Sequence, residues 1–208
     1  MAIRQILLTE GEYYHIYNRG NSKQIIFHDE QDYRYFMDLL LFMNSKKRLK
    51  VRDAKSNNND EAVVFVGVFC LMPNHFHLLL KQKMENGITI FMQKLSTSYV
   101  MYYNKKYKRR GGLFEGRFKA KHASDDVYLK YLFSYIHLNP IKLIDLNWKN
   151  NKINGKKYEF LEKYKYSSFN EYKNNEYVYV SKKDFPKYFP TADHFLKEIS
   201  YWLKFENK

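Results

Sequence analysis

Cysteine and long hydrophobic runs are both scarce in this sequence of 208 residues. The single cysteine, Cys70, excludes an internal disulfide framework and a zinc site built from cysteines, and it suits a reducing compartment. The longest uncharged apolar run covers residues 62–72, whereas a helix that crosses a bilayer needs roughly 20 residues. Residues 1–14 contain no apolar stretch typical of a signal peptide. We therefore expect a soluble cytoplasmic protein without a membrane span.

Acidic residues are in deficit as well. The chain has 22 Asp and Glu against 36 Lys and Arg, which gives a formal net charge of +14. A surplus of this size favours a polyanionic partner, either nucleic acid or an anionic membrane surface. Because no strongly basic amphipathic helix stands out, the membrane surface is the weaker prediction. Hydrophobic residues make up 45% of the chain, enough to form the core of one domain with a C-terminal extension.

The hydrophobic pattern predicts the order strand, helix, strand, strand, helix, strand, helix. Strands are expected at 13–19, 63–70, 75–81 and 117–123, and helices at about 33–43, 87–107, 125–138 and 192–205. Residues 45–60 are charged and rich in asparagine, so they are expected to form an exposed loop. The order is typical of an α+β fold with a ferredoxin-like antiparallel sheet and packed helices. We place this domain at 1–146, and a C-terminal extension that packs on it at 147–208.

Two histidines form the first candidate site. His75 and His77 lie two apart on a predicted strand, so both imidazoles point to the same face, about 6.5 Å apart along the strand. Two imidazoles placed in this way can bind one metal ion. The alternative is that they only line the surface of a hairpin. The opposite face of the strand is cleanly apolar, which favours the metal site modestly.

A stripe on the helix predicted after Ser124, its expected N-cap, forms the second candidate site. Tyr128, Tyr131, Tyr135 and Asn139 recur at helical spacing. Such a tyrosine stripe is more often a packing face than a functional one. Asn139 can also cap a short helix that begins with Pro140.

The most basic stretch runs from residue 105 to residue 121. Its cations interleave with Tyr103, Tyr107, Phe114 and Phe118. Charges for phosphates and aromatic faces for base stacking suit single-stranded nucleic acid, although such a run is more often a solvated surface. The predicted nucleic-acid contacts are Lys105, Lys106, Lys108, Arg109, Arg110, Arg117, Lys119 and Lys121.

Five motifs in register resemble one known family. The segment 72–80 (MPNHFHLLL) is similar to the metal-binding signature of the single-tyrosine HUH transposases, in which two histidines flank a hydrophobic residue. The segments 116–120 (GRFKA) and 135–142 (YIHLNPIK) resemble the REP-associated tyrosine transposases, relatives of the insertion-sequence transposases. The segments 14–21 (YHIYNRGN) and 166–172 (YSSFNEY) match the same family. The resemblance therefore reaches about residue 172.

The resemblance implies a role for each matching residue. The family's nucleophilic tyrosine falls on Tyr135, and His75 and His77 would hold a divalent cation, Mg²⁺ or Mn²⁺. Insertion-sequence relatives complete the metal site with a glutamine four residues after the tyrosine. That position is Asn139 here. The resulting pattern, Tyr-x-x-x-Asn-Pro, resembles that of the REP-associated branch. His137 is a poorer third ligand, because the i+2 position of a helix points away from Tyr135.

The family implies a metal-dependent transposase that cleaves and rejoins single-stranded DNA beside hairpins through a 5′-phosphotyrosine. The cation would polarise the phosphodiester, and no Walker-type loop is present for a nucleotide. The partner would be single-stranded DNA with hairpins, and the protein would be associated with the nucleoid. The family includes dimers and monomers, so whether the protein forms a homodimer stays open. Two alternatives are a non-catalytic, domesticated DNA- or RNA-binding module and a metal nuclease that uses water.

Overall fold

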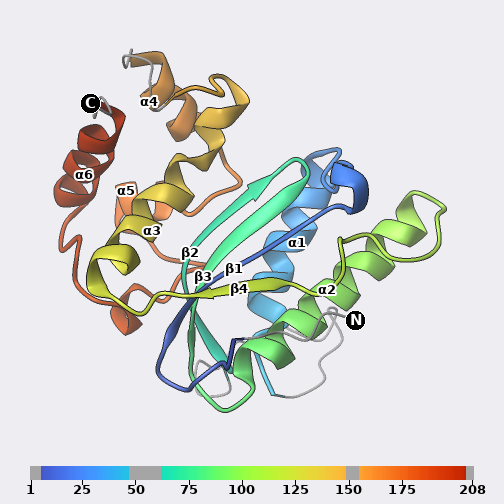
Figure 1. Ribbon diagram of the computed structural model, residues 1–208. Coiled ribbons are helices and arrows are strands. Elements are labelled where there is room, and N and C mark those ends of the chain that lie inside the picture. The colour runs from blue at the N-terminus through green and yellow to red at the C-terminus, as the bar shows by residue number, and fades with distance from the viewer. Residues whose placement is uncertain (1–5, 47–61, 149–154, 205–208) are drawn as a thin grey trace.

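The computed structural model describes residues 6–46, 62–148 and 155–204. Its centre is a four-stranded antiparallel sheet in the order β2-β3-β1-β4 (Figure 1). The strands are β1 (Tyr13–Arg19), β2 (Val64–Met72), β3 (His75–Gln82) and β4 (Lys119–His122). Helix α1 (Glu30–Phe42) connects β1 to the β2–β3 hairpin, and α2 (Gly87–Lys106) connects that hairpin to β4. This arrangement confirms the predicted α+β, ferredoxin-like fold.

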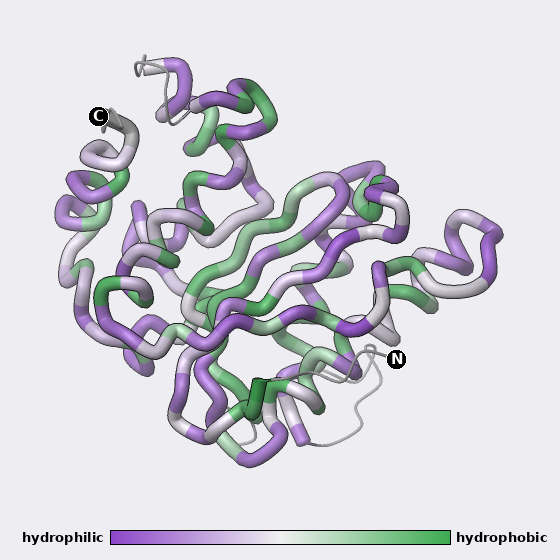
Figure 2. Tube along the Cα trace, viewed as in Figure 1, coloured by the Kyte–Doolittle hydropathy of each residue, from purple (hydrophilic) through white to green (hydrophobic). Residues whose placement is uncertain are grey.

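The sheet has two different faces because successive strand residues point to opposite sides. Phe76 and Leu78 on β3 are fully buried on the face covered by α1 and α2, where Phe76 lies 5.1 Å from Phe36 between ring centroids. The alternate residues of β3, including His77, point to the other face, which α3 (Asp126–Leu138) covers in part. Figure 2 shows the hydrophobic residues concentrated in β2 and β3, whereas β4 is more hydrophilic.

The later helices extend the second layer. Helices α4 (Gly155–Lys163), α5 (Phe169–Asn174) and α6 (Ala192–Lys204) follow α3, and α5 and α6 lie beside it in Figure 1. The described residues also form the short 3-10 turns η1 (Asn21–Lys23), η4 (Asn139–Leu143) and η5 (Lys182–Asp184). The amide of Ser168 donates to the carbonyl of Phe69 on β2 at 3.0 Å, and Phe169 and Phe195 are buried. These segments therefore add to the core over the α3 face.

A buried carboxylate joins α1 to α2. Asp32 is fully buried and accepts hydrogen bonds from Lys106 Nζ at 2.7 Å, Tyr107 Oη at 2.7 Å and Tyr102 Oη at 2.9 Å. Burial alone would raise the pKa of Asp32, but these bonds and one from the His28 amide lower it overall. A buried charge that is paired and fully hydrogen-bonded is the arrangement that a protein interior tolerates.

Local signals moved several predicted boundaries. Helix α1 begins at Glu30, three residues before its apolar stripe, because Asp29 accepts from the Asp32 amide as N-cap. The predicted N-cap Ser124 is wrong: Asp125 performs this role for α3 and accepts from the Tyr128 amide at 2.7 Å. Most of the loop expected at 45–60 lies outside the described residues. In the described part of the chain, every helix is too short or too polar to cross a membrane.

Candidate active site

The two histidines of the candidate site point to the α3 face of the sheet from the start of β3. His77 stands opposite Tyr17 of β1 and Cys70 of β2, and the rings of His75 and His77 lie 5.0 Å apart at 87°. The Pro73–Asn74 turn of the predicted hairpin places them at the first residues of β3, an interior strand of the sheet. The β3 strand therefore places both imidazoles next to each other on the same face of the sheet.

Each of these rings uses its Nδ1 atom in a hydrogen bond. His75 Nδ1 is 2.6 Å from Asn74 Oδ1, and His77 Nδ1 is 2.9 Å from Nε2 of His15 on β1. Within the described residues no hydrogen bond uses Nε2 of either ring, so both Nε2 atoms are left for a ligand. Metal-bound histidines have this pattern, in which the second nitrogen is held by another group.

The electrostatics keep these imidazoles neutral. Burial, then the nearby Lys142 and Arg19 charges, lower the pKa of His75 to about 4. Burial also lowers the pKa of His77 well below its usual range, and the neighbouring His15 and His75 lower it further. The pKa of His15 falls to about 4 for the same reason, with contributions from Lys121 and Lys142. Neutral imidazole is the form that binds a metal ion.

The donor set fits a divalent cation that brings other ligands with it. Among the described residues, no group of three or more His, Cys, Asp and Glu side chains could hold a metal ion. For a bound cation, two imidazoles would therefore supply the nitrogen ligands, and the remaining positions would need oxygens from an amide, water or a phosphate. Mg²⁺ and Mn²⁺ accept such oxygens readily.

Tyr135 of α3 contacts His77 of the pair and also His15 of β1. Its ring meets the His77 ring at 5.8 Å and 73° and the His15 ring at 6.0 Å and 80°. Asp125 fixes the first turn of α3, and buried Leu132 and Ile136 anchor its inner face. The half-buried tyrosine therefore stands at a fixed position across from the candidate metal ligands.

A hollow of about 350 Å³ connects Tyr135 with the histidines. It is lined by Tyr17, Asn18, Arg19, Asn74, His75, His77, Glu115, Lys119, Tyr135 and Lys142. Arg19 donates twice to Glu115, from Nε at 3.1 Å and from Nη2 at 3.0 Å, and so fixes one wall. Lys119 and Lys142 leave the hollow with a positive lining, which suits a phosphate group.

Asn139 is held in the last turn of α3. Its Nδ2 donates to the Tyr135 carbonyl at 2.9 Å, and its Oδ1 accepts from Lys142 Nζ at 2.7 Å. The expected helix cap is wrong, because η4 has Leu138 as its N-cap and no side-chain cap bond. The oxygen that would bind a metal is occupied by the Lys142 ammonium, so a role for Asn139 as third ligand stays a prediction and requires Lys142 to move.

His137 points away from the site, as its i+2 position predicts. It is fully buried, its Nε2 lies 2.8 Å from Ser168 Oγ, and its ring packs against Tyr172 and Phe195. Burial lowers the pKa of His137 to about 3. This histidine therefore joins α3 to α5 and α6.

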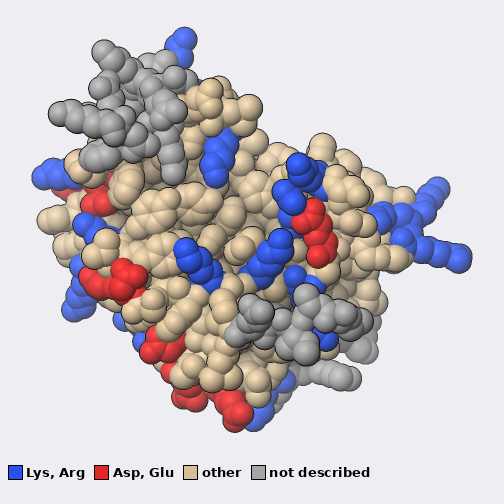
Figure 3. Space-filling view, in the orientation of Figure 1, with Lys and Arg blue, Asp and Glu red and all other residues tan. Residues whose placement is uncertain are grey.

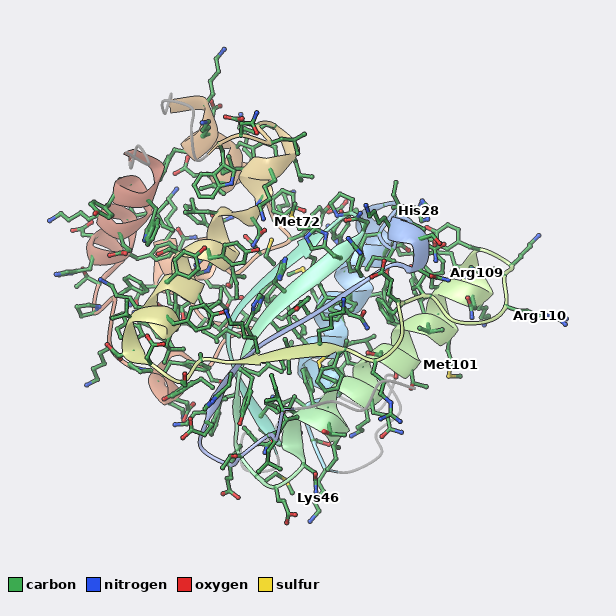
Figure 4. The ribbon with its side chains drawn as sticks, in the orientation of Figure 1. His28, Lys46, Met72, Met101, Arg109 and Arg110 are labelled. Atoms are coloured by element: carbon green, nitrogen blue, oxygen red, sulfur yellow. The ribbon has the colours of Figure 1, made fainter. Side chains whose placement is uncertain are left out.

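The basic stretch does not form one surface. Lys106 pairs with Asp29 and buried Asp32, and Arg109 lies over the Tyr103 ring and donates to the Gly112 carbonyl. Tyr103 is 4% exposed, so it cannot stack on a base. Figure 4 shows Arg109 and Arg110 on the loop after α2. The exposed cations divide between the end of α2 with its loop, which carries Lys105, Lys108 and Arg110, and the β4 region, which carries Arg117, Lys119 and Lys121.

Two residues of the site have no role in the prediction from sequence. His15 touches both His77 and Tyr135, and Lys142 touches Asn139 and lies 4.9 Å from the Tyr135 ring centroid. Alternation along β1 could have identified His15, because Tyr17 and Arg19 share its face. Lys142 gives no comparable signal, because only the turn at Asn139–Leu143 brings it back over α3.

Comparisons with known proteins identify similar sequences and similar folds. The family model "Transposase IS200 like" matches residues 10–139. A solved structure described as a REP-associated tyrosine transposase bound to a REP hairpin superposes with a TM-score of 0.56 at 10% sequence identity. The match covers 87% of this chain and 91% of that chain, so it shows a shared fold. No curated protein sequence matches this chain significantly.

Proposed function

Since the chain belongs to the IS200-like transposase family, we propose that it cleaves and rejoins single-stranded DNA with Tyr135 as its nucleophile. One observation carries this proposal: the Tyr135 ring lies edge-on to both His15 and His77, across one hollow. Covalent catalysis requires a nucleophile that is held beside the groups that bind the reacting phosphate.

The proposed step is a transesterification at phosphorus. The Tyr135 phenol oxygen forms a bond to the phosphorus atom, and the bond from phosphorus to the 3′ oxygen breaks. The phenol loses one proton and the leaving oxygen gains one, which gives a 5′-phosphotyrosine and a free 3′-hydroxyl. The covalent link conserves the energy of the phosphodiester, so the reverse reaction can rejoin a strand without a nucleotide cofactor.

His75 and His77 would hold the divalent cation through their Nε2 atoms, with Asn139 as the predicted amide ligand. When bound, Mg²⁺ or Mn²⁺ would polarise the phosphodiester and stabilise charge on its oxygens. His15 holds Nδ1 of His77 and so orients that ring. Lys142 and Lys119 line the hollow and would bind the phosphate oxygens.

Hairpin DNA is the substrate that we propose. The similar solved structure is bound to a REP hairpin, and the exposed cations after α2 and on β4 provide phosphate contacts on this chain. Figure 3 shows lysine and arginine side chains across the middle of one face and on the projecting loop, while the acidic side chains lie mainly along its left and lower-left margin, apart from one group right of the centre beside basic side chains. Phosphate contacts would position the DNA, and unpaired bases would give specificity.

A denaturing gel tests this proposal. Wild type, Tyr135→Phe and His75→Ala are incubated with labelled hairpin oligonucleotides from the flanks of the gene and with Mn²⁺ or Mg²⁺. Tyr35→Phe, which removes a hydroxyl from a half-buried tyrosine that stacks on Tyr102 between α1 and α2, serves as the matched control. We expect a denaturant-resistant protein–DNA adduct with wild type and Tyr35→Phe only.

The other outcomes identify the alternatives. Cleaved DNA without an adduct would replace the proposal with a nuclease that uses water. Binding by wild type without cleavage of any flank oligonucleotide would favour the non-catalytic module.

A further inference from the structure

Three tyrosines form a ladder along α3 that ends at the candidate nucleophile. The rings of Tyr128 and Tyr131 lie 6.2 Å apart at 23°, and those of Tyr131 and Tyr135 lie 5.6 Å apart at 25°. All three side chains are half-buried. The ladder therefore presents a series of nearly parallel rings whose last member lines the hollow.

The ladder is not the core face of α3. That face consists of other residues, which are at most 3% exposed: Leu129, Leu132, Phe133 and Ile136. A helix needs one apolar stripe to pack on a sheet, and these residues already supply it. The tyrosines flank that stripe, and Tyr131 meets Trp202 of α6 edge-on at 5.3 Å. Tyr128 and Tyr135 also pack in part against the core, yet all three tyrosines keep part of the side chain exposed.

Cations accompany both ends of the ladder. Lys142 Nζ lies 4.9 Å from the Tyr135 ring centroid, and Lys121 Nζ lies 4.3 Å from that of Tyr128. In the β1–β4 register Lys121 stands opposite His15 and Lys119 opposite Tyr17, so both exposed lysines point to the α3 face. A positive strip on edge strand β4 therefore runs beside the aromatic ladder.

Acidic groups limit the strip beyond Tyr128. Asp125 accepts from the Tyr128 amide, and Asp126 accepts from the Tyr188 hydroxyl. Along α3 itself, the Lys130 charge is paired with Glu198 of α6. The positive side of the ladder is consequently the side of β4.

From this arrangement we propose that Tyr128, Tyr131 and Lys121 bind the single-stranded DNA that leads away from the phosphate at Tyr135. Bases would contact the exposed tyrosine rings, and the phosphates would follow Lys121 and Lys119 on β4. Aromatic rings beside a basic groove are the usual platform for single strands, because every base has a π face. The assignment rests on the proposed function, since it takes the phosphate at Tyr135 as its starting point.

Fluorescence anisotropy in the Tyr135→Phe background tests the ladder without cleavage. The DNA probes are hairpins whose single-stranded flank is one, three, five or seven nucleotides long, with the flank on the 5′ or the 3′ side. Affinity should rise with flank length on one side. Tyr131→Leu and Tyr128→Leu should each weaken binding of the longest flank roughly tenfold, in line with stacking on one base.

Matched variants separate stacking from folding. Tyr131→Phe keeps the ring and should keep the length dependence, whereas Tyr131→Leu keeps the apolar packing and should lose it. Tyr35→Leu changes a half-buried tyrosine that stacks on Tyr102 at 4.1 Å between α1 and α2, and it should leave the length dependence intact. Lys121→Gln should weaken binding and reduce its salt dependence.

The inference and the proposed function can fail separately. An affinity that does not depend on flank length, or an equal loss of affinity in Tyr131→Leu and Tyr35→Leu, would overturn the ladder even if wild type forms an adduct. The ladder would also be overturned if Tyr131→Leu lost as much affinity for a hairpin with a double-stranded flank as for one with a single-stranded flank. A paired strand cannot stack its bases on the tyrosine rings. Absence of an adduct in the denaturing gel would overturn the proposed function alone.

Discussion

The imidazole of His15 on β1 is hydrogen-bonded to that of His77 on β3, with Nε2 and Nδ1 2.9 Å apart. The two rings are also stacked at 5.0 Å and 28°. This contact orients His77 so that its other nitrogen is left for a ligand. His15, which is not part of the HUH pair, therefore fixes the orientation of one member of that pair.

His15→Phe, which keeps an aromatic ring and removes the hydrogen bond, should weaken Mn²⁺ binding about 10- to 100-fold, as loss of such supporting contacts does in metal sites. Titration calorimetry or the electron paramagnetic resonance signal of free Mn²⁺ measures the affinity. His122→Phe is the control, because His122 points to the opposite face of the sheet and pairs with Glu12. Equal Mn²⁺ affinity in wild type and His15→Phe would refute this role.

Lys142 is expected to assist the Tyr135 reaction. Lys142→Met removes a cation that lines the hollow 4.9 Å from the Tyr135 ring, so the rate of adduct formation should fall about 100-fold, as it does when one preorganised donor is lost. Lys142→Arg should recover part of the rate. Lys130→Met removes a cation from α3, the helix of Tyr135, but one that is paired with Glu198, and this variant should react like wild type. An unchanged single-turnover rate in Lys142→Met would contradict the prediction.

His137 should make the fold sensitive to acid. Its pKa is about 3 in the native state against an ordinary value of 6.5, so between these values the unfolded chain binds a proton that the native chain does not. Stability therefore falls as the pH drops through this window. At pH 5 the cost from His137 is about 2 kcal/mol, from about 1.4 kcal/mol per pKa unit.

Urea unfolding at pH 7 and pH 5 measures this effect. His137→Gln should lose less stability between the two pH values than wild type does. His15, His75 and His77, whose pKa values are also lowered, contribute acid sensitivity to both proteins. Parallel losses in the two proteins would show that His137 is not responsible.

Lys106 should stabilise the fold, whereas the exposed Arg110 should bind DNA. Lys106→Met leaves the buried Asp32 carboxylate without its ammonium partner, which should cost about 3 kcal/mol of unfolding free energy. Arg110→Met should leave stability nearly unchanged and weaken hairpin binding mainly at low salt. Thermal unfolding and anisotropy compare the two variants. The reverse pattern would contradict the division of the basic stretch.

The sequence is sufficient to predict the sheet and the HUH pair, because both depend on alternation along a strand. His75, His77 and the apolar Phe76 and Leu78 divide between two faces by a period of two, and the structure keeps that division. The resemblance to the family predicts that Tyr135 faces the histidine pair, and in the structure its ring lies 5.8 Å from that of His77.

Tertiary contacts decide what the sequence could not show. Lys106 belongs to a basic run, yet the packing of α1 on α2 brings Asp32 to it and makes it an interior partner. Asn139 is a residue type that often caps helices, but its side-chain amide is hydrogen-bonded to the Tyr135 carbonyl and to Lys142 instead. Asp32 is far from Lys106 in the sequence, and Lys142 lies in a turn whose geometry the sequence leaves undetermined.

Peptide mapping of the covalent adduct tests the identity of the nucleophile most directly. Wild type is trapped on hairpin DNA with Mn²⁺ and digested with nuclease and trypsin, and fragmentation then locates the remaining nucleotide phosphate. The tryptic peptide 131–142 contains both Tyr131 and Tyr135, and fragment ions distinguish them. We predict the phosphate on Tyr135. A phosphate on Tyr131, Tyr128 or any other residue would contradict the proposed mechanism.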